Sequence, residues 1–244
     1  RDTPEGYSHY SLTNEGLNFI ESNSKNPFFL YLSYAIPHSW IEIPEEDRNY
    51  TQYLDRDWPD IQKRLDGMIS LIDQDVGKII RLLKKLKIEN NTLVIFTSDN
   101  GAHNAGGIIP DFFNDSGPLR GIKRDLYEGG IRVPFVAYWP SVIEPSRRSG
   151  HLAAHWDLMA TACDIAGLKL HDGTNSVSYL PLLKGTLDRQ KAHDFLYFEL
   201  HWPTKRSARK GQWVAVQKHT SSVDPSVNEI ELYNIDNDLS QKFI

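Results

Sequence analysis

The spacing of hydrophobic residues predicts a long helix between two buried strands. From Asp60 to Leu86, apolar residues recur at intervals of three and four positions, over about seven turns of one helix face. Residues 28–34 and 92–97 form apolar runs instead, as strands do when both of their faces are covered in a parallel sheet. A strand, a long helix and a second strand in this order indicate an α/β fold with a mostly parallel sheet flanked by helices.

Shorter patterns predict three more elements in the first three quarters of the chain. A helix is expected over 12–22, with Leu17, Phe19 and Ile20 facing inward. The pattern also predicts a strand over 133–139 and an amphipathic helix over 156–165, which Gly167 would end.

The pattern changes near Gly185. Beyond it, short apolar runs alternate with turns, which is typical of an antiparallel sheet; the runs are 195–200, 213–217 and 230–233. We therefore predict an α/β domain over residues 1–187 and a small α+β subdomain of the four-stranded antiparallel type over 188–244.

Composition excludes several classes of protein without naming a function. Hydrophobic residues make up 40% of the 244 residues and charged residues 24%, as in ordinary globular proteins. A net charge of -5 argues against a nucleic-acid partner, since basic residues cluster only near 205–210. No stretch has the roughly 18 apolar residues of a membrane span. One cysteine, Cys163, allows no disulfide within the chain.

Two candidate metal-ligating residues follow the second predicted strand. Asp99 and Asn100 come directly after residues 92–97, where open α/β sheets bind their ligands. A carboxylate and an amide carbonyl are hard oxygen donors that suit calcium or magnesium. An Asp-Asn-Gly sequence is also a frequent turn, so the pair alone does not establish a metal site.

Four segments, in order, resemble the second half of the type I sulfatases, the formylglycine-dependent family of the alkaline phosphatase superfamily. They read PFFLYLSYAIPH, TLVIFTSDNGAH, LRGIKRDLYEGGIRVPFVAYWP and SYLPLLKG. The third segment is the most specific, because its Lys, Glu-Gly-Gly and Arg-x-Pro positions recur together in that family. The resemblance implies an alkaline phosphatase-like fold and the activity of a sulfuric ester hydrolase such as an arylsulfatase.

The resemblance also implies a role for each matching residue. Asp99 and Asn100 correspond to two calcium ligands of the family. Lys123 corresponds to a lysine that contacts the sulfate, and His38 to a histidine near the leaving oxygen. These residue types fit the reaction, because a sulfate ester builds negative charge that a metal, an ammonium and a proton donor would stabilise.

Each assignment has a structural alternative. Lys123 lies in a basic segment that could be a solvated loop, and His38 could be an exposed residue beside a proline turn. His103 and Asn104 fall between the metal pair and Lys123 and could line a substrate pocket. We interpret Glu128 and the glycines after it as structural, and Cys163 as a small core residue.

The family's nucleophile is a formylglycine made from the first residue of a Cys-or-Ser, x, Pro, x, Arg motif. Cys163 is followed by neither the proline nor the arginine. We therefore expect the chain to be a fragment that lacks the nucleophile and the first two calcium-binding aspartates, and to be inactive alone. An incomplete parallel sheet would leave an open edge, so we also expect self-association or dependence on a complementary fragment.

Two other functions stay open. The first is a phosphatase or phosphodiesterase of the same superfamily, in which a histidine commonly follows the metal-binding Asp; Asn100 argues against it. The second is a glycan-binding remnant without catalysis. The segment DFFNDSGPLRG resembles loops of microbial sulfatases that act on sulfated carbohydrates, so we expect a sugar sulfate as substrate. By the same resemblance we expect an exported protein, located in the periplasm or at the cell surface.

Overall fold

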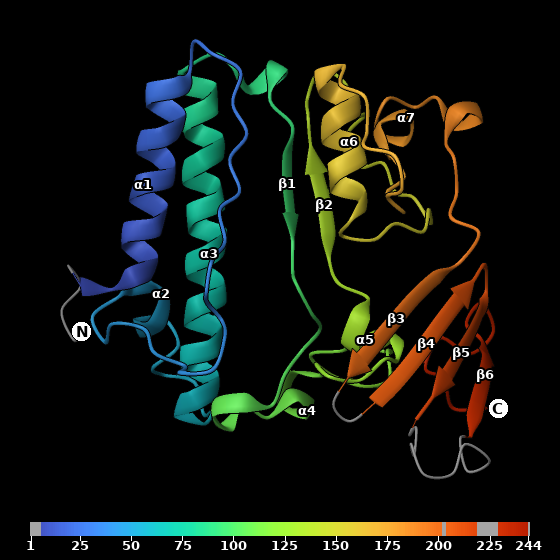
Figure 1. The fold of residues 1–244 in the computed structure, drawn as a ribbon. Coiled ribbons are helices and arrows are strands. Elements are labelled where there is room, and N and C mark those ends of the chain that lie inside the picture. Colours follow the sequence, from blue (N-terminus) through green and yellow to red (C-terminus); the bar gives the residue numbers. More distant parts are fainter. Residues whose placement is uncertain (1–5, 202–203, 219–228, 244) are drawn as a thin grey trace. The chain divides into compact units, whose positions relative to one another are not determined.

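The computed structural model describes residues 6–201, 204–218 and 229–243 (Figure 1). The chain divides into two compact units. The first consists of Arg1–Leu93 and His103–Phe113, and the second of Val94–Ala102 and Asn114–Ile244. The predicted boundary between residues 187 and 188 stays a prediction.

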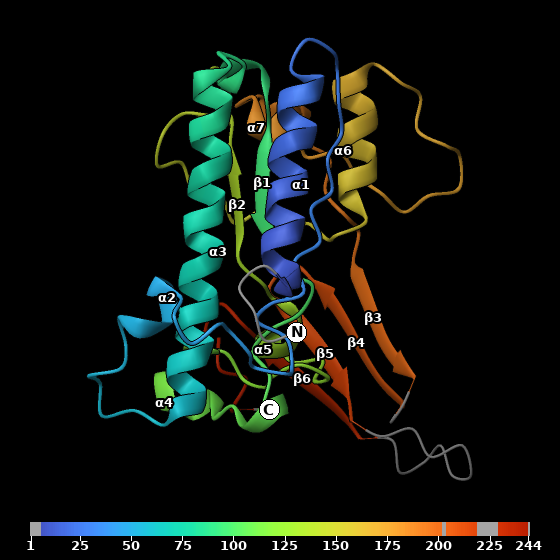
Figure 2. The same ribbon diagram turned by 90° about the vertical axis from the view of Figure 1, so that its left-hand side faces the viewer.

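Two long helices dominate the first unit. Helix α1 (Ser8–Asn23) lies beside α3 (Asp60–Lys85), as both views show (Figure 1, Figure 2). The short elements of this unit are α2 (Arg48–Thr51), η2 (Glu89–Asn91), η3 (Ala105–Gly107) and α4 (Pro110–Phe113). The core forms where α3 meets the loop after residue 36, and its buried members are Ile41, Ile43, Tyr50, Leu65, Met68, Leu71 and Ile108.

The long helix predicted from Asp60 is confirmed as α3. Asp60 in its first turn and Lys84 and Lys85 in its last turn complement the helix dipole. Of the positions predicted to face inward, Leu65 and Met68 are buried. Ile69, which also belongs to the periodic apolar pattern, is 49% exposed because it lies beyond the width of the buried stripe.

A buried polar junction joins α1 to α3. Asp75 of α3 accepts a hydrogen bond from His9 Nε2 at 2.9 Å and one from the Thr13 hydroxyl at 2.7 Å. Lys78 lies 2.6 Å from its other oxygen. Burial would raise the pKa of this carboxyl, but the bonds from His9, Lys78 and Thr13 outweigh burial and lower the pKa to about 2.

The buried strand predicted over residues 28–34 is wrong. The segment is extended but is not part of a sheet among the described residues. Its side chains alternate between half-buried and exposed, with Phe29 66% and Tyr31 74% exposed. Leu32 packs on Gly16 of α1, so one face of the segment is covered by a helix. Phe19 of α1, also expected inside, is 37% exposed, whereas Ile20 is buried.

The second unit begins with a two-stranded ribbon. Strand β1 (Val94–Thr97) pairs with β2 (Phe135–Tyr138) in antiparallel register, with Val94 opposite Tyr138. Both strands lie within the predicted runs, but the expected parallel pairing does not occur among the strands that the structure describes. The unit also contains α5 (Glu128–Ile131), α6 (Asp157–Ala166), α7 (Leu180–Leu183) and η4 (Leu187–Arg189). Gly167 ends α6 in the left-handed conformation, as predicted.

The predicted C-terminal sheet is present. Its four antiparallel strands follow one another in chain order: β3 (Leu196–His201), β4 (Thr204–Lys210), β5 (Trp213–Gln217) and β6 (Ile230–Asn234). Strand β4 was not predicted, because its sequence TKRSARK is basic and only Ser207 is buried. Val214, Val216, Tyr233 and Ile235 form the core of the sheet together with Tyr127. The chain is therefore an α/β protein with a small antiparallel sheet.

Candidate active site

The loop after β1 carries the predicted metal ligands. The Ser98 hydroxyl donates to the Asn100 carbonyl at 2.9 Å, and His155 Nε2 donates to the Ser98 carbonyl at 2.8 Å. The Asn100 amide nitrogen donates to the Gly101 carbonyl at 3.2 Å, which leaves its side-chain oxygen free to bind a cation. Asp99 is exposed. The turn thus presents a carboxylate and an amide oxygen on adjacent residues.

Gly101 joins this loop to the segment that carries Lys123. The Gly101 amide donates to the Gly130 carbonyl at 3.0 Å, and the Lys123 amide donates to the Ala102 carbonyl at 2.6 Å. A Cβ on Gly101 would lie only 1.8 Å from the Gly129 carbonyl oxygen, so only glycine allows this approach. Two backbone hydrogen bonds therefore bring Asp99, Asn100 and Lys123 into one part of the second unit.

The turn around Lys123 is fixed from the C-terminal sheet. Asp125 accepts a hydrogen bond from the Ile122 amide at 3.1 Å. Lys205 of β4 bonds the other oxygen of Asp125 at 2.9 Å and the Arg124 carbonyl at 3.2 Å. Sequence reasoning gave Lys205 no role, because it stands in the short basic cluster over 205–210 and its partner Asp125 lies 80 residues earlier in the chain.

Glu128 fixes the segment that carries Lys123 through ion pairs of its buried carboxylate. Its carboxylate is 2% exposed and accepts from Arg209 at 2.9 Å and from Arg132 at 3.3 Å. Its amide donates to the Gln241 side-chain oxygen at 2.8 Å. A buried carboxylate with two arginine partners supports a structural role for Glu128.

Arg120 and Tyr127 join the same segment to strand β6 of the C-terminal sheet. The Arg120 guanidinium lies 4.0 Å from the centre of the Tyr127 ring and donates to the Tyr233 hydroxyl at 3.0 Å. The Tyr127 hydroxyl donates to Glu231 at 2.5 Å. Burial would raise the pKa of the Glu231 carboxyl, but hydrogen bonds from Lys218 and Tyr127 outweigh burial and lower it.

His38 and His103 lie together in the first unit. Their ring centres are 6.0 Å apart. The Ala105 amide donates to His103 Nδ1 at 3.1 Å, so His103 Nε2 carries the proton and donates to the Pro37 carbonyl at 2.9 Å. The ring of His103 thus supports the backbone next to His38. His38 is exposed, and its Nδ1 lies 3.0 Å from the Ser39 hydroxyl.

The structure therefore groups the six predicted site residues in two sets. Asp99, Asn100 and Lys123 belong to the second unit, and His38, His103 and the exposed Asn104 to the first. Their chemical roles stay predictions. Both ring nitrogens of His103 already have protein partners, which favours a supporting role for this residue over a direct hydrogen bond to substrate.

The oxygen donors fit part of a metal site. Asp99 and Asn100 supply two of the six to eight oxygens that calcium prefers. Within the ranges that the structure describes, no group of three or more His, Cys, Asp and Glu side chains is arranged to hold a metal. The donor set agrees in kind with a calcium site and would require further ligands.

One expectation about the nucleophile needs correction. Ser116, Pro118 and Arg120 have the Ser-x-Pro-x-Arg spacing of the formylglycine motif, so the five-residue pattern is present in the chain. The structure gives these residues other partners: the Ser116 hydroxyl donates to the Gly121 carbonyl at 3.0 Å. Arg120 bonds Tyr233 and the Gln241 carbonyl. This geometry favours a structural turn over a site of modification.

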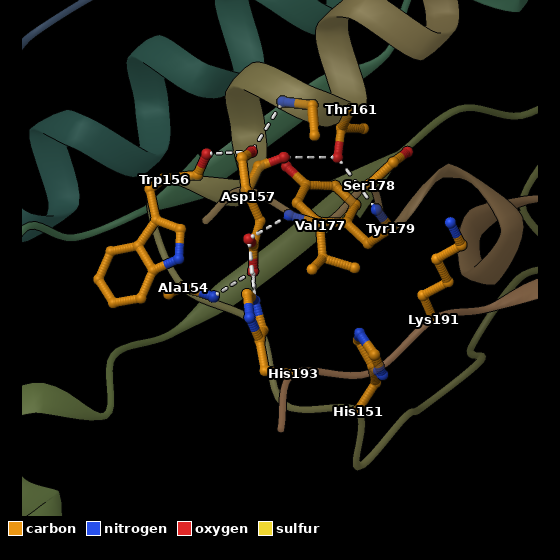
Figure 3. Close-up of polar contacts among 12 residues, drawn as sticks. His151, Ala154, Trp156, Asp157, Thr161, Val177, Ser178, Tyr179, Lys191 and His193 are labelled. Carbon is orange, nitrogen blue, oxygen red and sulfur yellow. Dashed lines mark hydrogen bonds and ion pairs between the residues drawn. The ribbon is translucent and has the colours of Figure 1, made fainter. Parts of the chain in front are cut away.

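A second histidine-carboxylate cluster lies at the start of α6 (Figure 3). Asp157 is 1% exposed and accepts from the Ala154 and Val177 amides, each at 2.8 Å, and from His193 Nε2 at 2.8 Å. Figure 3 shows His151 farther from this carboxylate, and burial lowers the pKa of its imidazole. Because chain groups already satisfy Asp157, we interpret the cluster as a junction that fixes α6.

Among the helices of the described residues, none has the length and apolar character needed to cross a bilayer. This agrees with the absence of a long apolar run in the sequence.

Comparison with known proteins identifies two overlapping family matches. Residues 1–168 match the family described as Sulfatase, and residues 122–242 match the family described as N-sulphoglucosamine sulphohydrolase, C-terminal. Human steryl-sulfatase is 32% identical over 192 residues, which cover 76% of this chain and 31% of that protein. N-acetylgalactosamine-6-sulfatase of Mus musculus is 35% identical over 171 residues, covering 69% of this chain and 31% of that protein.

A solved structure supports the same relationship. The crystal structure of Ps i-CgsB in complex with k-i-k-neocarrahexaose superposes with a TM-score of 0.80 at 28% identity, covering 96% of this chain and 50% of that one. The chain therefore spans about half the length of this structure and about a third of the length of the two curated relatives.

Proposed function

Because the chain belongs to the sulfatase family, we propose that the protein that contains it hydrolyses sulfuric esters of carbohydrates. The observation that carries the proposal is the pair of backbone hydrogen bonds that join the Asp99–Asn100 loop to the Lys123 turn. Oxygen donors for a cation and a lysine on neighbouring loops would suit an anionic ester whose hydrolysis builds more negative charge.

Family membership implies a metal and a formylglycine, and we propose that the metal is calcium. Asp99 and Asn100 would hold it, since hard oxygen donors prefer calcium over zinc. When bound, calcium would supply positive charge beside the sulfate oxygens. The formylglycine nucleophile would come from outside these 244 residues, because Arg120 is committed to the C-terminal sheet.

Lys123 and His38 would act on the ester directly. The Lys123 ammonium would bind a sulfate oxygen and oppose the charge that develops during cleavage of the sulfur–oxygen bond. If the Ser39 hydroxyl donates to His38 Nδ1, as their 3.0 Å separation allows, His38 Nε2 carries the proton. From Nε2 the proton would pass to the leaving sugar oxygen, which is the role of a general acid.

Carbohydrate is the proposed class of the leaving group. The structure of Ps i-CgsB, at 28% identity, was determined with a neocarrahexaose, and the segment DFFNDSGPLRG resembles loops of sulfatases that act on sugars. From the family resemblance we also propose that the protein is exported, to the periplasm or the cell surface. We further propose self-association through exposed apolar residues such as Phe135 and Val136 of β2.

The test uses purified full-length enzyme and a panel of esters: sulfated mono- and oligosaccharides, an aryl sulfate, and the matching phosphate esters. Calcium-dependent release of sulfate from a sugar, with phosphate release lower by about a hundredfold or more, is the expected result. Preferential phosphate release would support the phosphatase alternative. Sugar binding without release of either anion would support a non-catalytic glycan-binding protein.

A further inference from the structure

Trp40 has an unusual exposure for its size. It is 82% exposed, more than any other large hydrophobic side chain in the ranges that the structure describes. Burying an indole would stabilise the fold by roughly 2–3 kcal/mol. Within these 244 residues the indole forgoes that gain, although the core of the first unit begins at the next residue, Ile41, which is 6% exposed.

The backbone of Trp40 is also strained. Its φ of 67° lies in the left-handed region, which bulky residues rarely adopt and which costs on the order of 1–3 kcal/mol. Glycine would adopt the same angle without this cost. The chain therefore keeps a large aromatic side chain where a smaller, unstrained residue would serve the backbone better.

The surrounding structure holds this conformation firmly. The Trp40 carbonyl accepts a hydrogen bond from the Glu42 amide at 2.8 Å, and the Glu42 carbonyl accepts one from the Tyr7 hydroxyl at 2.7 Å. Gly106 packs beneath the turn, where an added Cβ would lie 3.3 Å from Ile41 and 3.7 Å from the Trp40 amide nitrogen. The hydrogen bonds of Glu42 and the close packing of Gly106 thus fix the backbone of Trp40.

The same turn carries His38, two residues away. His103 fixes the Pro37 carbonyl, and the Ser39 hydroxyl lies against His38 Nδ1. The turn therefore presents an imidazole, a hydroxyl and an exposed indole on three consecutive residues, His38, Ser39 and Trp40. An aromatic residue on a strained and firmly held backbone, beside a candidate proton donor, indicates a binding role, because strain of this kind collects where a ligand is bound.

We propose that Trp40 is a stacking platform for the pyranose ring that carries the sulfate ester, a role that rests on the function proposed above. A sugar ring has an apolar face of C–H groups, which suits an indole, and a rim of hydroxyls, which suits the polar residues of the turn. Stacking would hold the leaving oxygen near His38 Nε2. An aryl sulfate would gain less, because its stable phenolate leaving group depends less on remote binding energy.

The experiment compares Trp40→Gly and Trp40→Phe with the wild-type full-length enzyme. Trp40→Gly removes the ring and relieves the left-handed strain, so its melting temperature should equal or exceed that of the wild type. The ratio of kcat/KM for a sugar sulfate to kcat/KM for an aryl sulfate should fall about tenfold or more. Trp40→Phe should keep most of this ratio. The control is Tyr31→Ala, at a position 74% exposed in the same unit. It should leave the melting temperature and the ratio of the two kcat/KM values unchanged.

Three results would overturn the proposal. An unchanged ratio in Trp40→Gly would show that the indole does not contact the sugar. An equal loss on both substrates with a lower melting temperature would show that Trp40 only maintains the turn. Wild-type enzyme that turns over no sulfate ester would refute the proposed function itself, and this inference with it, whereas wild-type turnover with an unchanged ratio refutes the inference alone.

Discussion

Replacing Gly101 with alanine tests whether the backbone contact between the two loops organises the site. The new Cβ would lie 1.8 Å from the Gly129 carbonyl oxygen and 3.2 Å from the Gly130 Cα. Real contacts of this kind are essentially never shorter than 3.0 Å, so the two segments must separate by more than about 1 Å. Backbone atoms cannot yield as a flexible side chain would.

The cost can be estimated from the contacts that would be lost. Overpacking of a tight contact costs about 1–3 kcal/mol. The separation would also weaken the bonds from the Gly101 amide to Gly130 and from the Lys123 amide to Ala102, each worth about 1 kcal/mol. We expect a loss of about 3–5 kcal/mol in the free energy of unfolding. A shift of about 1 Å in Lys123 relative to Asp99 should lower kcat/KM by about a hundredfold.

The assay pairs denaturant unfolding with release of sulfate by full-length enzyme. Gly150→Ala is the matched control, because a Cβ at Gly150 would meet no atom within 4 Å. The control should match the wild type in both measurements. If Gly101→Ala also matched the wild type, the close approach of the two loops would be refuted, and with it the explanation for how the Lys123 segment is held beside the Asp99–Asn100 loop.

Three further predictions concern single side chains. Asp99→Ala and Asn100→Ala should each weaken calcium binding by the full-length enzyme, because each removes an oxygen ligand; calorimetric titration giving wild-type affinity would remove that residue from the site. Asp75→Asn should lower the free energy of unfolding by about 2 kcal/mol at pH 7, because folding lowers the pKa of the Asp75 carboxyl to about 2. The charged carboxylate contributes this stability above about pH 4, the pKa of an aspartate in the unfolded chain, and the contribution disappears as the pH falls through about 2. Urea unfolding at pH 7 and pH 3 measures this, and an equal loss at both values would contradict it. Ser116→Ala should retain sulfatase turnover; complete loss would identify Ser116 as the nucleophile instead of a turn residue.

The sequence was sufficient to predict the elements with strong periodicity. Helix α3, the strand before Asp99 and three strands of the C-terminal sheet lie where the apolar pattern places them. Strand β4 was missed because its side chains are basic and its only buried residue is Ser207. An extended apolar run over 28–34 was wrongly expected to be a buried strand, since an apolar run does not reveal whether a sheet or a helix covers it.

Candidate site residues could be named from the sequence, whereas the contacts that support them could not. Residue type and the family resemblance indicated Asp99, Asn100 and Lys123. Sequence reasoning could not find the contact of Gly101 with Gly129 or the bond from Lys205 to Asp125, because both join positions more than 25 residues apart. Only the folded chain shows such contacts. They give Gly101 and the partly buried Lys205 structural roles.

The kinetic effect of Lys123→Ala tests the central claim most directly. The side chain can be removed without disturbing the turn, because the contact with Ala102 is made by the backbone amide. With calcium saturating, we predict that kcat for a sugar sulfate falls by about a hundredfold or more while the melting temperature is unchanged. Arg124→Ala, which removes a neighbouring exposed charge, should stay within about threefold of the wild type, the scale of an exposed charge. Near-normal turnover by Lys123→Ala would contradict the assignment of this loop to the active site.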